Sequence, residues 1–232
     1  MIVPFYDERD NLERIPDELK PAIDQLGLSW ELVLVDDGSR DDSLAVARRV
    51  AAELTAATVV PHGRNRGLGA ALRTGFETAR GELWLTLDSD LTFHPRDAAK
   101  LLDRFRQGDV DVVLGSPALA GYDADIAWYR VVLSKGANLL YQLALGRRLT
   151  AVTPIFRLYR AASMRPLTLG CDGFDINAEV LAKLLLGGAR VAEVPVTLHQ
   201  REHGVSKLRN TAEIVNHLRM LARIVRWRLG GR

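Results

Sequence analysis

The chain has 232 residues, enough for one domain with a large core, and its 47% hydrophobic and 26% charged residues are typical of a globular protein. Its single cysteine, Cys171, excludes an intrachain disulfide and a cysteine-based metal site, and no apolar run reaches the ~20 residues of a membrane span. The net charge of +2 is uneven, because residues 201–232 hold eight Lys and Arg against two acids. This basic segment indicates either an anionic partner surface, membrane or nucleic acid, or a solvated helix.

Apolar runs alternate with helical periodicity along the first half of the chain. Strands are expected at residues 1–5, 31–35, 58–61, 82–87 and 110–115. Helices are expected at residues 11–26, from Asp41 or Asp42 to 54, at 64–80, and from Pro95 to 107. Pro16 and Pro21 should break or kink the first of these helices. The alternation predicts an α/β fold, a mostly parallel twisted sheet with helices on both faces.

The alternation stops after Ser116. A loop is expected at 117–126, a helix at 127–145, a strand at 155–159, a helix at 174–186, a strand at 191–198 and a last helix at 208–229. The strand at 191–198 should lie at a sheet edge, because Pro195 cannot donate a ladder hydrogen bond. We expect one domain over residues 1–207, followed by a basic helix within 208–232. The apolar stripe of that helix, Ile214, Leu218, Leu221 and Val225, should either lie on an anionic membrane or pack on the domain.

Asp88-Ser89-Asp90 follows the apolar run 83–87, at the C-terminal end of a predicted strand. Ligands bind at this edge of an open α/β sheet, and paired carboxylates there can hold Mg²⁺ or Mn²⁺ through oxygen ligands. Alone, such a pair more often only caps the next helix. Polar stretches also follow other strands, at 4–8, 35–39 and 115–117, so the sheet can bring all of them to one pocket.

The motifs at these strand ends resemble family 2 inverting glycosyltransferases with a GT-A fold. They are Pro4-Phe5-Tyr6-Asp7-Glu8, Val35-Asp36-Asp37-Gly38-Ser39, Arg64-Asn65-x-Gly67 and Asp88-Ser89-Asp90. The second half resembles, more narrowly, the dolichol- or polyprenol-phosphate sugar synthases. That likeness rests on Trp128-x-Arg130 with Ser134, on Phe156-Arg157-Leu158-Tyr159, on Gly173-Phe174-Asp175, on Glu193-Val194-Pro195-Val196, and on Arg201-x-x-Gly204-x-Ser206-Lys207.

The resemblance implies a role for each matching residue. Pro4, Tyr6 and Glu8 would line the nucleotide site, Val35 and Asp37 would contact the base, and Ser89 would lie against the ribose or diphosphate. Asp88 and Asp90 would bind Mg²⁺ or Mn²⁺, Arg130 and Ser134 would hold the acceptor phosphate, and Arg201 and Lys207 would close over the diphosphate. Arg64 and Asn65 are expected only to shape a turn, and His62, His94 and His199 to lie at the surface.

The predicted reaction is metal-dependent, inverting transfer of a hexose from a nucleotide-sugar, of the GDP-mannose or UDP-glucose type, to a polyprenyl phosphate. Such an acceptor is already anionic, so it needs positioning more than a general base. The partners would be the nucleotide-sugar, the lipid and a membrane surface, with no nucleic acid. The protein would lie in the cytoplasm or at the cytoplasmic membrane face.

Two other interpretations stay open. A saccharide hydroxyl as acceptor would need a base, for which Asp175 is the candidate. A degenerate paralogue could instead bind nucleotide-sugar without turnover. Departures from the family pattern at Pro117, Ala151, Pro154 and Ile155 favour this last hypothesis, while the intact Asp-x-Asp pair counts against it.

Overall fold

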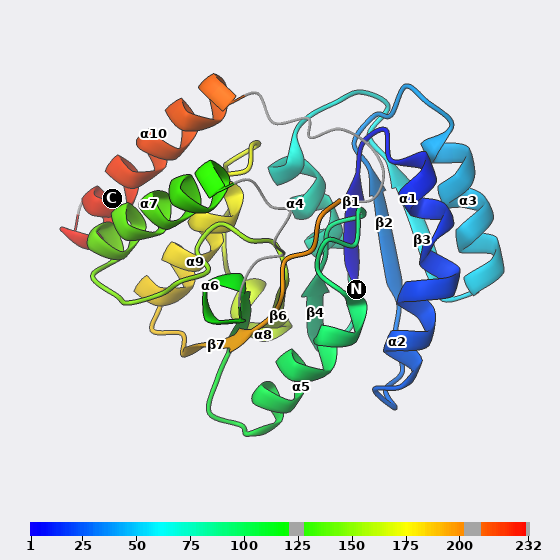
Figure 1. Cartoon of the computed structure of the whole chain (residues 1–232), viewed down its shortest axis with the longest axis horizontal. Helices are drawn as coiled ribbons and strands as arrows, with labels where there is room; N and C mark the ends of the chain where they lie inside the picture. Colours follow the sequence, from blue (N-terminus) through cyan, green and yellow to red (C-terminus); the bar gives the residue numbers. More distant parts are fainter. Residues whose placement is uncertain (121–127, 202–209, 231–232) are drawn as a thin grey trace.

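Seven strands form one sheet in the order β3-β2-β1-β4-β6-β5-β7 in the computed structural model (Figure 1). The structure describes residues 1–120, 128–201 and 210–230; side chains are not described for 128–134 and 210–212. The strands are β1 (Ile2–Phe5), β2 (Leu32–Asp36), β3 (Ala57–Pro61), β4 (Leu83–Thr86), β5 (Val112–Ser116), β6 (Arg157–Arg160) and β7 (Val191–Pro195). All neighbouring pairs are parallel except those that β6 makes with β4 and β5, so the mostly parallel sheet is confirmed.

Most of the helices lie where the sequence predicts them. They are α1 (Arg9–Glu13), η1 (Ile15–Leu19), α2 (Lys20–Asp24), α3 (Ser43–Leu54), α4 (Leu68–Thr78), η2 (Pro95–Asp97), α5 (Ala98–Arg106), α6 (Pro117–Ala120), α7 (Trp128–Leu145), α8 (Ala161–Met164), α9 (Ile176–Leu186) and α10 (Asn210–Arg228). The short helices α6 and α8 were not expected. The helix expected over 11–26 is divided into α1, the π-helical turn η1 and α2. Pro16 and Pro21 stand in the first turns of η1 and α2, where a missing N–H is tolerated.

Successive strand residues point to opposite faces of the sheet, which divides the core in two. Val3 and Leu34 belong to the cluster that contains side chains of α1, α3 and α5. Ile2 and Val33 belong to the cluster that contains side chains of α4, α7, α9 and α10. Helices therefore cover both faces, as the sequence predicts.

Two details of the second half differ from expectation. Residues 117–126 are not all loop, because Pro117–Ala120 forms the short helix α6. Residues 121–126 lie outside the described part of the chain. β6 runs antiparallel between β4 and β5, pairing Leu85 with Leu158 and Val113 with the same residue. β7 lies at the edge of the sheet, as Pro195 predicts.

The C-terminal helix α10 packs against α7 and α9 (Figure 1). Met220 and Ile224 are fully buried in the core, and His217 Nδ1 lies 2.6 Å from the Tyr141 hydroxyl on α7. Of the expected apolar stripe only Leu221 packs against the core, while Ile214, Leu218 and Val225 are exposed. None of the described helices combines the length and apolarity needed to cross a bilayer.

Candidate active site

Polar segments follow β1, β2 and β4 at one edge of the sheet, and hydrogen bonds fasten the first two together. The Asp7 N–H donates to Ser39 Oγ at 3.0 Å, and Asp7 Oδ1 accepts from the Arg40 N–H at 2.6 Å. Asp7 has a φ of 50°, a strained conformation that is frequent at functional sites. These bonds join the segment after β1 to the segment after β2.

The strand residues of the expected nucleotide site lie inside the sheet. Pro4 and Val35 are register partners in β1 and β2, and both are buried. The Val35 side chain is fully buried in the core, so a contact between this residue and a base would use main-chain atoms. Tyr6, directly after β1, is partly exposed.

Glu8, Asp90 and Arg201 form an ionic cluster at this edge. The Arg201 Nη1 donates to Glu8 Oε1 at 3.2 Å, while its Nε and Nη2 both donate to Asp90 Oδ2, at 2.8 and 2.5 Å. The other Glu8 oxygen accepts from the Asn11 amide at 2.6 Å, and Asp90 Oδ1 accepts from the Thr92 N–H at 3.1 Å. The structure thus brings together three of the expected site residues, from the segments after β1, β4 and β7.

Asp88 stands beside this cluster. Burial raises the pKa of its carboxyl well above the ordinary range; the negative charges of Asp90 and Glu8 raise it further, and Arg201 opposes them. No described side chain or N–H donates a hydrogen bond to it. Ser89 is buried between the two acids, and Leu91 after them has a φ of 54°. A desolvated carboxylate beside two others favours a bound cation.

The raised pKa of Asp88 predicts a pH-dependent stability. Below the ordinary aspartate pKa both the folded and unfolded states hold the proton, and stability is at its full value. As the pH rises, the unfolded state releases this proton first, so the free energy of unfolding falls. In EDTA, we expect Asp88→Asn to flatten the fall in melting temperature between about pH 4 and pH 7. Calorimetry checks this.

The matched control for that measurement is Asp109→Asn. Its partner Arg104 lowers the pKa of Asp109 through a hydrogen bond at the surface, so the replacement should leave the curve between about pH 4 and pH 7 as it is in the unmodified chain. Parallel curves for the unmodified chain and Asp88→Asn would contradict the electrostatic description of the cluster.

The donor set fits a hard divalent cation only in part. Asp88 and Asp90 offer carboxylate oxygens, which Mg²⁺ and Mn²⁺ prefer. Within the described residues no group of three or more acidic, histidine or cysteine side chains is arranged to hold a metal ion. The pair would therefore bind an ion whose remaining ligands come from a diphosphate and from water.

Asp37 lies at the end of β2 in a second cluster. His62 Nδ1 lies 2.9 Å from Asp37 Oδ1, and its Nε2 lies 2.9 Å from the Thr74 hydroxyl. The backbone N–H groups of Arg66 and Gly67 donate to the two Asp37 oxygens. The expectation that His62 lies at the surface is wrong, because its side chain is 3% exposed. The carboxylate at β2 attracts it inward.

The expected acceptor side is described only in part. Arg130 and Ser134 lie on α7, the helix that the sequence predicts, but their side chains lie outside the description. Lys207 lies outside the described residues. The roles of these three residues stay predictions.

Two charged residues that the sequence analysis quoted in motifs, without a role, hold the loop at 150–153. Arg157 is fully buried; its Nη1 donates to the Asn177 carbonyl at 2.7 Å and its Nη2 to the Val152 carbonyl at 2.5 Å. Glu193 Oε1 accepts from the N–H groups of Thr150 and Ala151, at 2.8 and 2.7 Å. Their signals in the sequence were their places in two family motifs, a cation inside an apolar strand and an acid in an edge strand.

Asp175, the candidate base, precedes α9 and is 7% exposed. Burial raises the pKa of Tyr141 most, and the negative charge of Asp175 raises it further. The same charge also acts to raise the pKa values of Cys171 and His217. These neighbours belong to the layer of α7, α9 and α10. They place the Asp175 carboxylate among helices rather than at the strand ends that carry Asp88 and Asp90.

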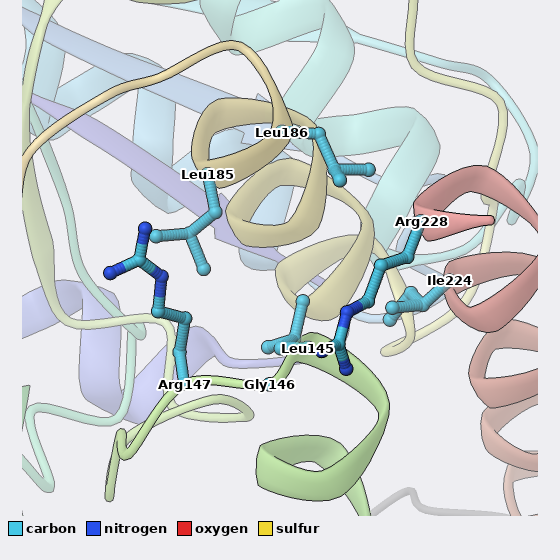
Figure 2. Close-up of a pocket in the computed structure, with 7 residues that line it drawn as sticks. All are labelled: Leu145, Gly146, Arg147, Leu185, Leu186, Ile224 and Arg228. Carbon is cyan, nitrogen blue, oxygen red and sulfur yellow. The ribbon is translucent and has the colours of Figure 1, made fainter. Parts of the chain in front are cut away.

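A pocket of about 350 Å³ opens between the C-terminal ends of α7, α9 and α10 (Figure 2). Its lining is Leu145, Gly146, Arg147, Leu185, Leu186, Ile224 and Arg228. Arg228 Nη1 donates to the Leu143 and Ala144 carbonyls at 3.3 and 3.4 Å, near the end of α7. No carboxylate lines this pocket, so it is separate from the site at the sheet edge.

Comparisons with known proteins agree with this geometry. A family model described as glycosyl transferase family 2 matches residues 1–167. The chain is 30% identical over 230 residues to a dolichol-phosphate mannosyltransferase of Pyrococcus furiosus, covering 98% of this chain and 63% of the relative. It is 30% identical over 240 residues to a polyprenol monophosphomannose synthase of Mycolicibacterium smegmatis, covering 100% of this chain and 87% of the relative. The chain therefore spans less than two thirds of the first relative.

A solved structure has the same fold. It is glucosyl-3-phosphoglycerate synthase from Mycobacterium tuberculosis in complex with Mn²⁺, uridine diphosphate and glucosyl-3-phosphoglycerate. The TM-score is 0.72 at 20% identity, with 100% of this chain and 79% of that chain covered. At this identity the likeness carries the fold alone, and it confirms the expected GT-A architecture.

Proposed function

The chain belongs to glycosyl transferase family 2, and from this premise we propose that it transfers a hexose from a nucleotide-sugar to a polyprenyl phosphate with inversion. The names of the two relatives, one a dolichol-phosphate and one a polyprenol transferase, support a lipid phosphate as acceptor. The proposal extends to the metal, Mg²⁺ or Mn²⁺, and to the position of the protein at the cytoplasmic face of a membrane.

The observation that carries the proposal is the joint position of Glu8, Asp88, Asp90 and Arg201. Transfer leaves a nucleoside diphosphate, so negative charge develops on the leaving group as the sugar carbon becomes cationic. A bound divalent ion would neutralise part of that charge. Arg201 already bridges acids from β1 and β4, which puts a guanidinium within reach of a diphosphate held there.

The chain's own residues would then act in sequence. Asp88 and Asp90 would hold the ion. Arg201, whose guanidinium contacts Glu8 and Asp90, would donate to the diphosphate oxygens, because Arg donors suit phosphate geometry. Ser89, buried between the acids, would fix the backbone beside the ribose.

The direct test is incubation of the chain with nucleotide-sugars, Mn²⁺ and polyprenyl phosphate. The panel should include both uridine and guanosine diphosphate sugars, with nucleotide release and glycolipid formation measured together. Glycolipid from any donor supports the function. Release of nucleotide without glycolipid, or no turnover with any donor, would contradict it; the second result with intact nucleotide binding would favour a degenerate paralogue.

An exposed apolar surface on α7 and α10 supports the membrane part of the proposal. The two helices lie side by side (Figure 1). Their outward apolar side chains are Leu139, Leu140 and Leu143 on α7 and Ile214, Leu218 and Val225 on α10, each at least 43% exposed. Arg147, Arg219 and Arg226 are exposed near them. Apolar side chains with a basic rim suit the headgroup region of an anionic bilayer.

Point variants test this surface better than a truncation, because Met220 and Ile224 of α10 belong to the core. We expect Leu143→Glu with Leu218→Glu to lower binding to anionic vesicles about fivefold or more, since each change adds a charge where apolar burial is needed. Co-sedimentation at low salt measures it. Leu28→Glu, at a residue 45% exposed between α2 and β2, is the matched control. Equal vesicle binding by the unmodified chain, the double variant and Leu28→Glu would contradict the proposed membrane surface.

A further inference from the structure

The pocket between the C-terminal ends of α7, α9 and α10 combines cations with apolar side chains. Its lining contains two arginines, Arg147 and Arg228, and no acid. Figure 2 shows the two arginines on opposite sides of Leu145. The other large side chains of the lining are apolar: Leu145, Leu185, Leu186 and Ile224. Such a lining suits a ligand that has both an anionic group and an apolar body.

The segments that line this pocket carry no acidic residue. Asp and Glu are absent from residues 126–170, 180–192 and 214–232, while Lys or Arg occurs in each of these segments. Among the described residues neither Arg147 nor Arg228 forms an ion pair. The positive charge of the pocket is therefore not neutralised by the protein, and it complements an anion.

Most side-chain donors of the two arginines make no hydrogen bond with the described residues. Arg228 uses only Nη1, which donates to the Leu143 and Ala144 carbonyls at 3.3 and 3.4 Å. Its guanidinium lies against Gly146, where an added Cβ would be 2.5 Å from the Arg228 Cζ. The Arg147 side chain is exposed and makes no described hydrogen bond. One cation is thus held in place, and the other can turn toward a ligand.

The helix ends account for Arg228 but not for Arg147. The C-terminal end of a helix carries partial negative charge, which attracts a cation. Arg228 meets this need by donating to carbonyls of α7. The same end is also capped by its own backbone, since the N–H groups of Gly146 and Arg147 donate to the Gln142 carbonyl at 2.8 and 3.3 Å. The side chain of Arg147 has no part in this capping, so its charge is left for an anion.

The pocket adjoins the exposed apolar surface of α7 and α10. Leu143 and Val225 belong to that surface, and Leu145 and Ile224 on the same helices line the pocket. Leu186, also in the lining, is 48% exposed. The volume of about 350 Å³ is near the lower end for ligand pockets, so it takes a headgroup rather than a complete lipid. The acyl chains of that lipid would continue over the leucines into the bilayer.

We propose that this pocket binds the phosphate of an anionic phospholipid, with Arg147 and Arg228 as its donors and the leucines against its acyl chains. Arginine pairs with phosphate oxygens through charge-assisted hydrogen bonds. The inference rests on the membrane part of the proposed function and names the lipid that this part would recognise. It is not the acceptor site, because Arg130 lies near the other end of α7, about 22 Å from Leu145 by helical rise.

Calorimetry of the full chain with dihexanoyl phosphatidylglycerol, kept below the concentration at which it forms micelles, tests the pocket without a membrane. We expect Arg147→Gln to weaken lipid binding about tenfold, because a charge-assisted hydrogen bond is lost. The fold should tolerate this change, since the side chain is exposed and has no described partner. Arg148→Gln is the matched control. It removes an exposed cation at the next residue, outside the lining, and should bind lipid as the unmodified chain does.

Two further probes separate the parts of the ligand. Glycerol 3-phosphate carries the phosphate without acyl chains and should bind at least about tenfold more weakly than the lipid, because no methylene is buried. Dihexanoyl phosphatidylcholine has the same chains but a headgroup of zero net charge, and should also bind more weakly. Equal binding of glycerol 3-phosphate would mean that the pocket takes a soluble phosphate and would overturn the lipid assignment. Equal binding of phosphatidylcholine would overturn the role of the anionic charge.

The pocket and the membrane surface fail separately. If phosphatidylglycerol does not bind, or if Arg147→Gln and Arg148→Gln bind it equally, the pocket proposal is overturned. A loss of vesicle binding in the Leu143→Glu and Leu218→Glu double variant would still support the membrane surface in that case. Tenfold weaker lipid binding in Arg147→Gln alone, with vesicle binding lost in the double variant, is the result that supports both.

Discussion

Replacing Asp88 or Asp90 by alanine will lower turnover at least about 10²–10³-fold and will remove the metal dependence of nucleotide binding. The physical reason is that these two carboxylates, after β4, would supply oxygen ligands to an ion held by the diphosphate. Glu8, the third acid, is tied on one oxygen by Asn11. Calorimetry with UDP, with and without Mn²⁺, measures the binding, and nucleotide release measures turnover.

Asp103→Ala is the matched control for these two variants. Asp103 lies on α5 with a side chain 72% exposed, paired with Arg106 at 3.6 Å, so its loss removes the same chemical group far from any strand end. Its turnover and binding should equal those of the unmodified chain. Metal-dependent nucleotide binding that survives intact in Asp88→Ala and Asp90→Ala would remove these acids from the metal site.

Local patterns account for the part of the fold that the sequence predicts. The strands β1 to β5 are short apolar runs bounded by polar turns, and the helices after them repeat apolar residues at helical spacing. Both kinds of element can therefore be recognised from a short stretch of sequence. The direction of β6 is not local. Leu158 pairs with Leu85 and with Val113, residues 73 and 45 positions earlier, and no short pattern specifies that insertion.

The site residues also divide into those that a local sequence pattern places and those that depend on contacts far apart in the chain. The strand-end position of Asp88 and Asp90 follows from the apolar run before them. Arg201 reaches Asp90 across 111 positions, and only the family resemblance brought it to the site. His62 was misplaced at the surface because a histidine carries no apolar pattern, and the acid that draws it inward is 25 positions away. Arg157 stood in a motif without a role, because its carbonyl partners Val152 and Asn177 lie outside β6.

Transfer to polyprenyl phosphate, and none to the matching free polyprenol, is the expected result when one active donor is offered to both acceptors. A phosphate monoester has a second pKa of about 6 and attacks as an anion, whereas an alcohol needs a base to become a good nucleophile. Asp175 is the candidate for that base, and its described neighbours are Cys171, Tyr141 and His217 in the helical layer. Glycolipid analysis with both lipids measures the difference.

Variants on α7 and before α9 separate the two acceptor chemistries. We expect Arg130→Ala to raise the acceptor KM or lower kcat while donor binding stays nearly intact, because Arg130 and Ser134 stand one helical turn apart and would offer a cation and a hydroxyl to the phosphate. Lys135→Ala, at an exposed cation on the same helix, is the control and should change neither constant.

Asp175→Asn should cost less than ~10-fold in turnover, since loss of a true general base costs about 10²–10⁴-fold. The replacement keeps the size of the side chain, so a small loss would reflect its contacts with the helical layer rather than a proton transfer. Efficient transfer to the neutral polyprenol or to a saccharide hydroxyl, abolished by Asp175→Asn, would overturn the phosphate mechanism. In that case the carboxylate before α9 would act as the base at the acceptor hydroxyl.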